Sequence, residues 1–279
     1  MKISIAVPSY NYGVYLTDCL NSILNQNYSN YEVLICDGGS QDDSLHIIQN
    51  FCTKDERFKL VSQKDIGQSD AIIKAFLQSD GDILCFLNAD DMFITNTVFS
   101  EVVSSFLNFN RIDIVSFGGY YINSNGINIK KINLRYHPFD DFTQMKYRTA
   151  VIQPSTFWKR HVYINTPFKI GFEFSFDSVF FYECFLKYNW LELTLPVSGY
   201  RWHNSNKSST ISSKRVGELM NFEKIKFGNY SFRVFYLKLI KYIFYIVEQI
   251  YFIPNKFKNV LRILVNGISY LTFYRLPSI

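Results

Sequence analysis

Residues 3–37 read ISIAVPSYNYGVYLTDCLNSILNQNYSNYEVLICD, and this stretch decides the fold class. Residues 3–7 and 31–36 are short apolar runs that are rich in β-forming side chains. Between them, residues 14–26 carry apolar side chains at the spacing of an amphipathic helix. Two strands joined by a helix predict a βαβ unit, whose strands lie parallel in one sheet.

The same alternation continues through residue 117. Strands are expected over 58–62, 82–87 and 112–117, and helices over 42–52, 67–78 and 95–109. Such alternation predicts an α/β fold, with a mostly parallel central sheet flanked by helices. Ligands of these sheets bind beyond the carboxyl ends of the strands, so the polar residues at those ends are the first candidates for a functional site.

Beyond residue 118 the pattern is less regular, although no linker or internal repeat requires a second domain before residue 229. Asn125-Gly126 predicts the turn of a hairpin within residues 120–133. Residues 151–158 predict a strand that Pro154 confines to an edge or an irregular position. Helices over 177–188 and 214–227 and a strand over 190–195 are also expected.

The composition excludes several classes of protein. The 279-residue chain is 48% hydrophobic and only 19% charged, which excludes intrinsic disorder. Its five cysteines have neither CxxC nor zinc-ligand spacing, so we expect reduced thiols, a cytoplasmic location and no cysteine metal site. The apolar run after Met1 is too short for a secretory signal and reads better as a first strand.

Residues 230–279 differ in charge from the rest of the chain. They hold seven basic residues and one acid, whereas the whole chain has a formal charge of +5. The remainder is therefore close to neutral, which argues against nucleic acid binding over the whole surface.

Within this basic segment, residues 231–252 and 256–275 flank Pro254 and predict two helices in which aromatic residues alternate with Lys and Arg. The charges disfavour a membrane-spanning helix. Two interpretations stay equally open. The helices lie in a bilayer interface, or they pack on the body or on another subunit.

Polar residues follow the first two predicted strands. The first strand ends in Pro8-Ser9-Tyr10-Asn11, where proline ends strand pairing and leaves polar groups at the carboxyl edge. The second ends in Asp37-Gly38, which offers an acceptor for a base or ribose beside a glycine that lets a ligand approach the backbone. Taken alone, this second segment is more typical of an Asp-Gly turn before a helix that Asp42 caps.

The next two strand ends repeat the pattern and change the interpretation. Asp65, Gln68 and Asp70 follow the third strand, and Asn88-Ala89-Asp90-Asp91 follows the fourth. Adjacent carboxylates repel each other, and no stability reason requires them at a strand end. A divalent cation, Mn²⁺ or Mg²⁺, takes oxygen ligands and bridges to phosphate. The four strand ends together therefore predict a site for a metal and a nucleotide.

The four segments VPSYN, DGGSQDDS, QKDIGQSDAIIKAF and GDILCFLNADD resemble, in order and spacing, the family 2 glycosyltransferases, which have the GT-A fold and use nucleotide-sugar donors. The resemblance covers about residues 3–210. It implies that Asp37 contacts the nucleotide base and that Asp65 holds the uridine or ribose. Asn88-Ala89-Asp90 matches the DxD motif of the family, with Asn88 in place of its first Asp, so metal binding is left to Asp90 with support from Asp91. The resemblance also places Pro8, Ser9, Tyr10, Asn11, Gly38, Gln68, Asp70, Asn88, Ala89 and Arg201 in the donor site.

Further along, the resemblance implies an acceptor-side carboxylate at the start of a helix, and Asp177 occupies that place. Asp177 is the expected general base, helix capping is its alternative role, and Glu173 is the nearest rival. In the segment that resembles the family's Tyr-Arg-x-His, Arg201 is expected to neutralise diphosphate and His203 to complete the metal shell. Gln153 resembles a position lining the acceptor cleft, although a place in a core strand is the better interpretation.

The resemblance implies transfer of a hexosyl or N-acetylhexosaminyl group, with inversion, from a nucleotide-diphosphate donor. UDP is the default nucleotide, and the acceptor is expected to be a hydroxyl of a lipid-linked or polysaccharide glycan. Together with the change in charge at residue 230, it divides the chain into a catalytic domain, residues 1–229, and the basic extension, residues 230–279. Residues 1–117 would bind the donor and residues 118–229 the acceptor. The extension would hold a cytoplasmic enzyme on the inner face of the cell membrane, and assembly into a homo-oligomer is left open.

Other functions predict different residues. A sugar nucleotidyltransferase would show a Gly-rich run with Arg and Lys after the first strand, where this chain has Pro8-Ser9-Tyr10-Asn11. A dinucleotide-dependent oxidoreductase would need GxGxxG at that place, and the sequence has none. A non-catalytic relative that only binds nucleotide sugars would have lost carboxylates, whereas Asp37, Asp90 and Asp177 are all present.

Overall fold

The computed structural model describes residues 1–62, 65–132, 151–169 and 171–203, together with 217, 218, 220–222, 224, 238, 239 and 242. The chain divides into two compact units. Unit 1 comprises Met1–Tyr136, Ala150–Gly171 and Phe180–His203, and unit 2 comprises His137–Thr149, Phe172–Val179 and Asn204–Ile279.

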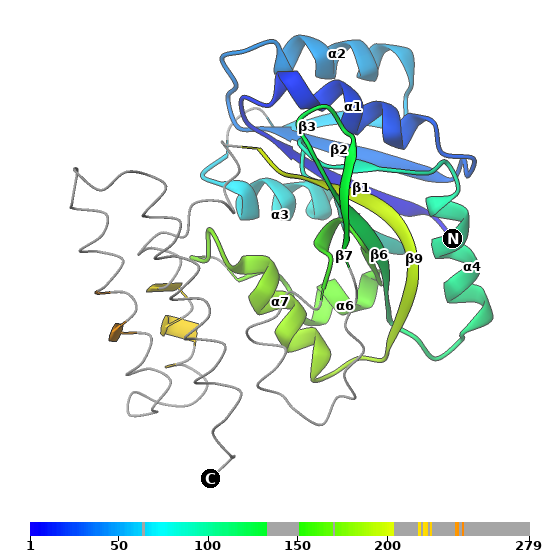
Figure 1. Cartoon of the computed structure of the whole chain (residues 1–279), viewed down its shortest axis with the longest axis vertical. Coiled ribbons are helices and arrows are strands. Elements are labelled where there is room, and N and C mark those ends of the chain that lie inside the picture. Colours follow the sequence, from blue (N-terminus) through cyan, green and yellow to red (C-terminus); the bar gives the residue numbers. More distant parts are fainter. Residues whose placement is uncertain are drawn as a thin grey trace. The chain divides into compact units, whose positions relative to one another are not determined.

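The first part of unit 1 follows the predicted alternation (Figure 1). Its elements are β1 (Ile3–Ser9), α1 (Gly13–Leu24), β2 (Tyr31–Asp37), α2 (Ser44–Lys54), β3 (Phe58–Ser62), α3 (Gln68–Gln78), β4 (Ile83–Phe86), β5 (Met92–Phe93) and α4 (Val98–Asn108). The later elements are β6 (Ile114–Ile122), β7 (Asn128–Ile132), the short 3₁₀ helix η1 (Gln153–Ser155), β8 (Thr156–Lys159), α6 (Arg160–Asn165), α7 (Phe176–Phe185) and β9 (Trp190–Arg201).

One sheet joins all the strands of the described residues, in the order β3-β2-β1-β4-β8-β6-β9-β5, with β7 paired to β6. The first four of these strands are parallel, which confirms the mostly parallel α/β architecture. In the register of β1 and β2, Ser9 lies opposite Asp37, so the two strands end level with each other. The polar segments that follow them therefore begin at the same edge of the sheet.

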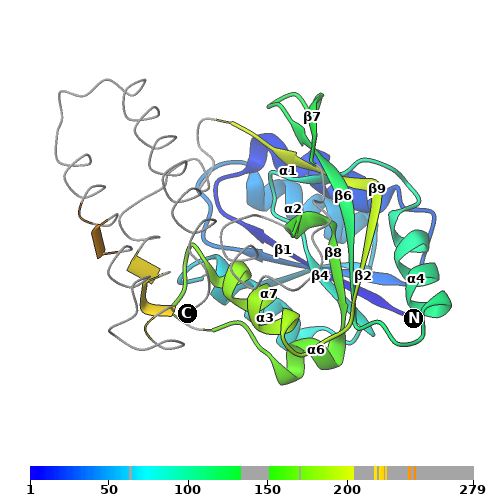
Figure 2. The ribbon, with the colours of Figure 1, turned by 60° about the horizontal axis from the view of Figure 1, so that its bottom comes forward.

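Helices cover both faces of the sheet. On one face, α1, α2 and α4 bury side chains such as Leu20, Ile48 and Phe99 against Ile5 and Val33 of the sheet. Figure 2 shows α3, α6 and α7 on the opposite side of the sheet from α1 and α2. There the buried aromatic side chains of Phe76, Phe86, Trp158, Phe168 and Phe180 contact one another. The sheet is therefore the middle of three layers and a rigid base for its loops.

The structure corrects the prediction for residues 151–158. We expected an edge or irregular strand, but β8 lies between β4 and β6, antiparallel to both. Pro154 belongs to η1, before the strand begins, so its missing N–H breaks no ladder bond. Pro154 therefore does not restrict the position of β8, because the strand begins only at Thr156.

Two further differences concern the end of unit 1. The strand predicted over 190–195 continues to Arg201, and it passes Pro196 where its register with β6 shifts. The short β5 pairs with this extension and was not predicted. The predicted hairpin is confirmed, because β6 and β7 flank a turn in which Gly126 has φ +77°.

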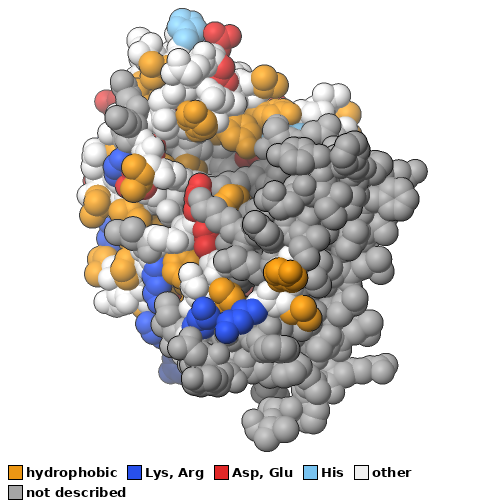
Figure 3. Space-filling model, turned by 90° about the vertical axis from the view of Figure 1, so that its left-hand side faces the viewer, with side chains coloured by type: hydrophobic (Ala, Val, Ile, Leu, Met, Phe, Trp, Pro, Cys, Tyr) orange, Lys and Arg blue, Asp and Glu red, His pale blue; other side chains and the backbone are white. Residues whose placement is uncertain are grey.

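All five cysteines are free thiols. No helix formed by the described residues is both long and apolar enough to cross a membrane. Most of residues 230–279, on which the membrane prediction rests, lie outside the described part of the chain. On the face drawn in Figure 3, the described part carries basic, acidic and hydrophobic side chains side by side, without one continuous patch of a single kind.

Candidate active site

The loops after β1 and β2 are joined by hydrogen bonds. The Asn11 amide donates to the Ser40 hydroxyl at 2.8 Å, and the Gln41 amide donates to the Asn11 side-chain oxygen at 2.8 Å. Asn11 has φ +56°, a left-handed conformation that asparagine tolerates better than most residues. Two of the predicted strand-end segments therefore form one structure at the carboxyl edge of the sheet.

Asp37, the last residue of β2, lies beneath these loops and is 2% exposed. Its carboxylate accepts hydrogen bonds from the backbone amides of Gly39 and Ser40 at 3.0 and 2.8 Å, and from the Ser40 hydroxyl. Tyr10 is more than half exposed, and its ring lies so close to Gly38 that a Cβ there would be 3.2 Å from it. The loop thus brings a fixed carboxylate and an exposed aromatic ring close together.

The segment before α3 contributes a charged cluster. Lys74 forms ion pairs with Asp65 at 3.2 Å and with Asp70 at 2.7 Å, and Asp70 accepts a hydrogen bond from the Ile66 amide. Gly67 has φ +143°, a conformation that favours glycine. The α3 lysine therefore holds both predicted carboxylates in place.

Asn88 is the centre of an amide network. Its side-chain oxygen accepts a hydrogen bond from Gln68 at 2.6 Å, and its side-chain nitrogen lies 3.3 Å from Asp91 and 3.2 Å from Gln153. Gln153 in turn donates to the backbone oxygen of Phe86, at the end of β4, at 2.6 Å. The structure brings Gln68 and Asn88 together. It also corrects our interpretation of Gln153, which lies in η1 rather than in a core strand and whose side chain contacts Asn88.

Asp90 and Asp91 are both buried beside this network. The Nε2 atom of His203 lies 3.1 Å from Asp90 Oδ2, and its ring contacts the ring of Tyr15 at a tilt, with centroids 4.7 Å apart. Burial raises the pKa of Asp90, although the hydrogen bond to His203 opposes the shift. Burial also raises the pKa of Asp91 well above its usual range, and the charge of Asp90 adds to this effect. Two buried carboxyl groups at one turn are costly to ionise unless a positive charge lies beside them.

Arg201 places a buried positive charge beside Asp90 and Asp91. It has no exposed surface, its backbone amide donates to Asp91 at 2.8 Å, and its Nε donates to the backbone oxygen of Asp90 at 2.6 Å. Its guanidinium also reaches Ser124 O at 2.7 Å and Asp18 at 3.1 Å. These contacts make Arg201 a clamp on the Asp90–Asp91 turn, and its predicted contact with diphosphate stays a prediction.

Asp177 lies in the first turn of α7, within unit 2. Its carboxylate accepts a hydrogen bond from the Ser178 amide at 2.7 Å. In the same unit, the carboxylate of Glu218 accepts from three successive backbone amides, those of Glu173, Phe174 and Ser175, at 2.9, 2.9 and 3.1 Å. Glu218 therefore fixes the backbone that leads into α7 and Asp177.

Sequence reasoning missed Asp18 and Glu218. Asp18 lies on α1 among apolar positions, and its sequence neighbours give no sign that it pairs with Arg201 in the folded chain. Glu218 is 8% exposed, and a buried acid needs partners, but its burial is known only from the structure, so the sequence gives no signal for it.

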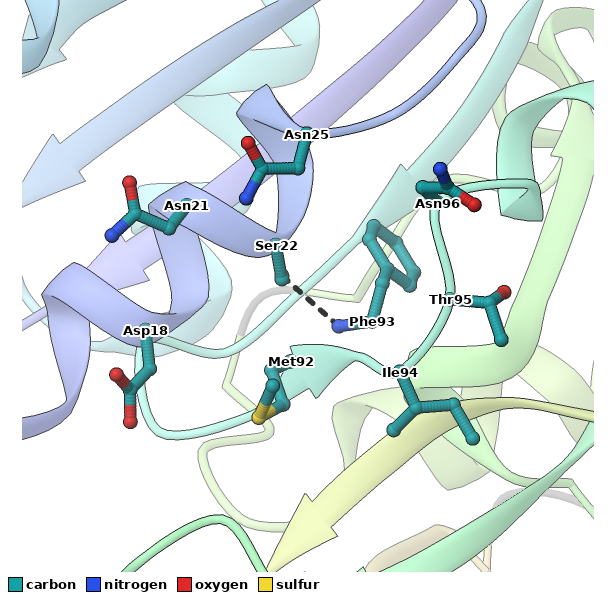
Figure 4. A pocket seen from close by; sticks show the side chains of 9 residues that line it. All are labelled: Asp18, Asn21, Ser22, Asn25, Met92, Phe93, Ile94, Thr95 and Asn96. Carbon is teal, nitrogen blue, oxygen red and sulfur yellow. Dashed lines mark hydrogen bonds between the residues drawn. The ribbon is translucent and has the colours of Figure 1, made fainter.

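A surface pocket of about 300 Å³ lies between α1 and the residues around β5 (Figure 4). Its lining consists of Asp18, Asn21, Ser22, Asn25, Met92, Phe93, Ile94, Thr95 and Asn96. Ser22 spans the two walls, because its hydroxyl accepts a hydrogen bond from the Phe93 amide at 3.0 Å. None of the predicted site residues lines this pocket.

The residues around Asp90 fit a divalent cation in part. Within the described ranges, no three His, Cys, Asp or Glu side chains form a complete metal-binding group. Asp90 and His203 nevertheless offer an oxygen and a nitrogen donor at one point, beside the buried carboxylate of Asp91. The carboxylate oxygens of this set are ligands that Mn²⁺ and Mg²⁺ prefer, whereas an imidazole nitrogen is not a ligand that Mg²⁺ prefers.

Sequence comparison finds relatives for about a third of the chain. The chain is 41% identical over 95 residues to an uncharacterized glycosyltransferase of Haemophilus influenzae, which covers 34% of this chain and 38% of that protein. It is 38% identical over 89 residues to a chondroitin synthase of Escherichia coli, covering 32% of this chain and 13% of that protein. The alignments span well under half the length of these relatives.

Solved structures share the fold over a larger part of the chain. S. aureus TarS, in complex with UDP-GlcNAc, matches 81% of this chain and 66% of its own, with a TM-score of 0.61 and 18% identity. A mannosyltransferase from Pyrobaculum calidifontis, in complex with GDP-Man and Mn²⁺, matches 78% of this chain and 62% of its own, with a TM-score of 0.58 and 16% identity. Residues 4–180 match the family described as glycosyl transferase family 2. Because this match spans more than half of the chain and includes the carboxyl ends of β1 to β4, the chain belongs to glycosyl transferase family 2 and has its GT-A fold.

Proposed function

We propose that the protein transfers a hexosyl or N-acetylhexosaminyl group from a UDP-sugar to a hydroxyl of a glycan acceptor, with inversion at the anomeric carbon. The observation that carries the proposal is the meeting of Asn88, Asp90, Asp91 and His203 beside β4, at the edge where Asp37 ends β2. UDP-GlcNAc and GDP-Man in the structures with the same fold support a nucleotide sugar as the donor.

The donor site is proposed at the carboxyl ends of β1 to β4. Asp37 and Tyr10 would hold the base, and Asp65 with Asp70 would hold the ribose. The backbone of Pro8, Ser9 and Gly38 would line the nucleotide. Their positions support this assignment, because Asp37 is fixed by three local hydrogen bonds and Tyr10 is open to solvent.

Asp90, Asp91 and His203 would hold a Mn²⁺ or Mg²⁺ ion, which supplies positive charge for the departing diphosphate. The burial of Asp90 and Asp91 supports this role, because a cation bound beside two buried carboxyl groups would stabilise their ionised forms. Asn88 would orient Asp91 through its side-chain nitrogen. Arg201 would keep the turn in place from its buried position.

Asp177 is the proposed general base, which takes the proton from the acceptor hydroxyl as that oxygen attacks the anomeric carbon. Direct displacement by a single attack inverts the configuration at that carbon. The first turn of a helix keeps a carboxylate ionised, because the helix N-terminus favours negative charge. An ionised Asp177 is the form that accepts a proton.

The proposal is tested by nucleotide binding. Calorimetry should find UDP binding in Mn²⁺ and much weaker binding in EDTA, and UDP-sugars should be turned over. Asp90→Ala should abolish turnover with the melting temperature maintained, whereas Glu101→Gln, which removes a carboxylate on α4, should leave both unchanged. Equal UDP affinity in Mn²⁺ and EDTA would refute the metal role, and absence of nucleotide binding in both would refute the function.

We also propose that residues 1–229 are the catalytic domain and that residues 230–279 hold it peripherally on anionic membrane, where lipid-linked glycans are assembled. The seven basic residues of the extension support this, at about 1 kcal/mol for each one near an anionic surface. The protein should sediment with anionic vesicles and be released by high salt. Failure to sediment would favour packing of the extension on the body or on a second copy.

A further inference from the structure

A row of aromatic side chains lies at the end of β9, next to the candidate active site. Tyr121 of β6 contacts Tyr200 with ring centroids 5.8 Å apart and Trp202 with centroids 6.2 Å apart, both edge to face. Trp202 is 51% exposed, whereas Tyr121 and Tyr200 are partly buried. We propose that these three rings form a platform on which a pyranose ring of the acceptor glycan stacks.

The strand register makes Tyr121 a direct neighbour of residues on two other strands. Tyr121 lies opposite Tyr200 in the β6–β9 pairing and opposite Lys130 in the β6–β7 pairing. Residues directly opposite each other on neighbouring strands are close neighbours. Lys130, Tyr121 and Tyr200 therefore form a row across three strands, with the exposed Lys130 at one end. The row offers ring surface for stacking and an ammonium donor for hydroxyl or carboxylate groups of a sugar.

The platform is rigidly tied to the proposed metal site. The Trp202 amide donates to the backbone oxygen of Ile122 at 2.8 Å, which extends the pairing of β9 with β6 past the last strand residue. The residues on either side of Trp202 are the buried Arg201 and His203, and both contact Asp90. The side chains of Arg201 and His203 thus contact Asp90, and Trp202, which lies between them in sequence, exposes its indole ring to solvent.

The chemistry of the row suits a sugar ring. A pyranose presents an apolar face of C–H groups, which carry a small positive charge, and aromatic faces carry a negative one. A large exposed indole loses apolar contact with water when such a face covers it. The nucleotide base already has a proposed place, beside Asp37 and Tyr10, so the row is assigned to the acceptor. This inference rests on the proposed function, because it takes the acceptor to be a glycan.

Acrylamide quenching of tryptophan fluorescence tests the platform on the whole protein. Trp158 is fully buried and Trp190 is partly buried, so Trp202 dominates the quenching. The probes are tetrasaccharides of glucose, N-acetylglucosamine and galacturonic acid at millimolar concentration, and UDP with Mn²⁺. At least one tetrasaccharide should protect Trp202, whereas UDP should not.

Variants measured by calorimetry complete the test. Tyr121→Ala and Trp202→Ala should weaken binding of the protecting tetrasaccharide about 5- to 10-fold, and Trp202→Phe should restore most of it. UDP affinity should be unchanged in all three. Phe109→Ala, which removes an aromatic ring 49% exposed at the end of α4, is the matched control and should bind like the wild type.

Three results would overturn the platform: no tetrasaccharide protects Trp202, the Tyr121 and Trp202 variants bind as tightly as the wild type, or UDP itself protects Trp202. These outcomes differ from failure of the proposed function. If UDP fails to bind with or without Mn²⁺, the transferase proposal fails, and the tetrasaccharide titrations still decide whether Trp202 contacts a sugar.

Discussion

Asn88 shows what a single residue contributes at the site. Its amide has both a donor and an acceptor, so it accepts from Gln68 and lies within donor reach of Asp91 and Gln153. An Asp at this position would add a third carboxylate beside the buried Asp90 and Asp91 and would lose the donor. The departure from the DxD pattern therefore lowers the negative charge of the turn and keeps Asp91 oriented.

Asp177 is the residue on which the proposed chemistry depends most. Asp177→Asn keeps the shape and a capping oxygen but removes the proton acceptor, so the turnover rate should fall about 100-fold or more. UDP affinity and the melting temperature should change little. Steady-state kinetics with a UDP-sugar, calorimetry and thermal melts check these three values. A variant that melts early yet turns over normally would make Asp177 a helix cap and Glu173 the next base to test.

At the scale of elements, the side chain of Glu218 connects the helical segment that contains it to the backbone just before α7. Its carboxylate accepts three backbone amide bonds, and Glu218→Gln would replace a charged acceptor by a neutral one. Hydrogen bonds to a charged group contribute about 1.5–3 kcal/mol, so we expect a lower melting temperature. If this contact positions Asp177, kcat should also fall about 10-fold with the donor KM unchanged.

Glu218→Asp provides the comparison, because it keeps the charge on a shorter side chain and should recover part of kcat. Lower stability with normal kcat in Glu218→Gln would show that the contact serves the fold alone. A rise in the donor KM would place Glu218 in the donor site instead.

The loop between α3 and β4 depends on one glycine. A Cβ on Gly81 would lie 2.5 Å from the Ser4 hydroxyl, 2.7 Å from the Ser4 nitrogen and 2.9 Å from the Lys2 oxygen. The backbone of β1 must then move, so Gly81→Ala should lower the free energy of unfolding by about 1–3 kcal/mol. Urea titration measures this as a lower midpoint with the same slope. An unchanged midpoint would mean that the loop can retreat from β1 without cost.

At the scale of the whole molecule, Glu32 ties the strands together at the sheet edge opposite the site. It accepts from the Ser4 hydroxyl at 2.7 Å, the Asp80 amide at 2.9 Å and Lys59 at 3.0 Å, and it pairs with Lys2 at 3.2 Å. Burial alone would raise the pKa of Glu32, but the hydrogen bonds from Asp80, Ser4 and Lys59 outweigh it and lower the pKa from 4.5 to about 2. A buried carboxylate thus joins segments that are far apart in sequence.

This shift predicts how stability depends on pH. Because the folded pKa is depressed, the contribution of Glu32 is full above pH 4.5 and is lost as the pH falls toward 2. At pH 7, Glu32→Gln should therefore lower the free energy of unfolding by about 3 kcal/mol. Urea titrations across this pH range should show the difference between wild type and variant shrinking as the pH falls. A difference that is constant with pH would show that Glu32 is not the group whose titration matters.

The sequence by itself determined the parallel half of the fold and the place of its site. Apolar periodicity and the chemistry of strand ends are local properties, so β1 to β4, their helices and the strand-end residues Asp37, Asn88 and Asp90 could be predicted. Parallel strands joined by helices must end at one edge of the sheet, which is why those residues converge.

Only the tertiary structure decided how distant residues complete the site. His203 reaches Asp90 across 113 residues of chain, and Gln153 reaches Asn88 across 65. These contacts depend on the central antiparallel β8 and on the long β9, whose positions follow from side-chain packing on neighbouring strands. Pro154 pointed away from a central strand because its effect is local, whereas a place in a sheet is fixed by partners that the local sequence does not contain.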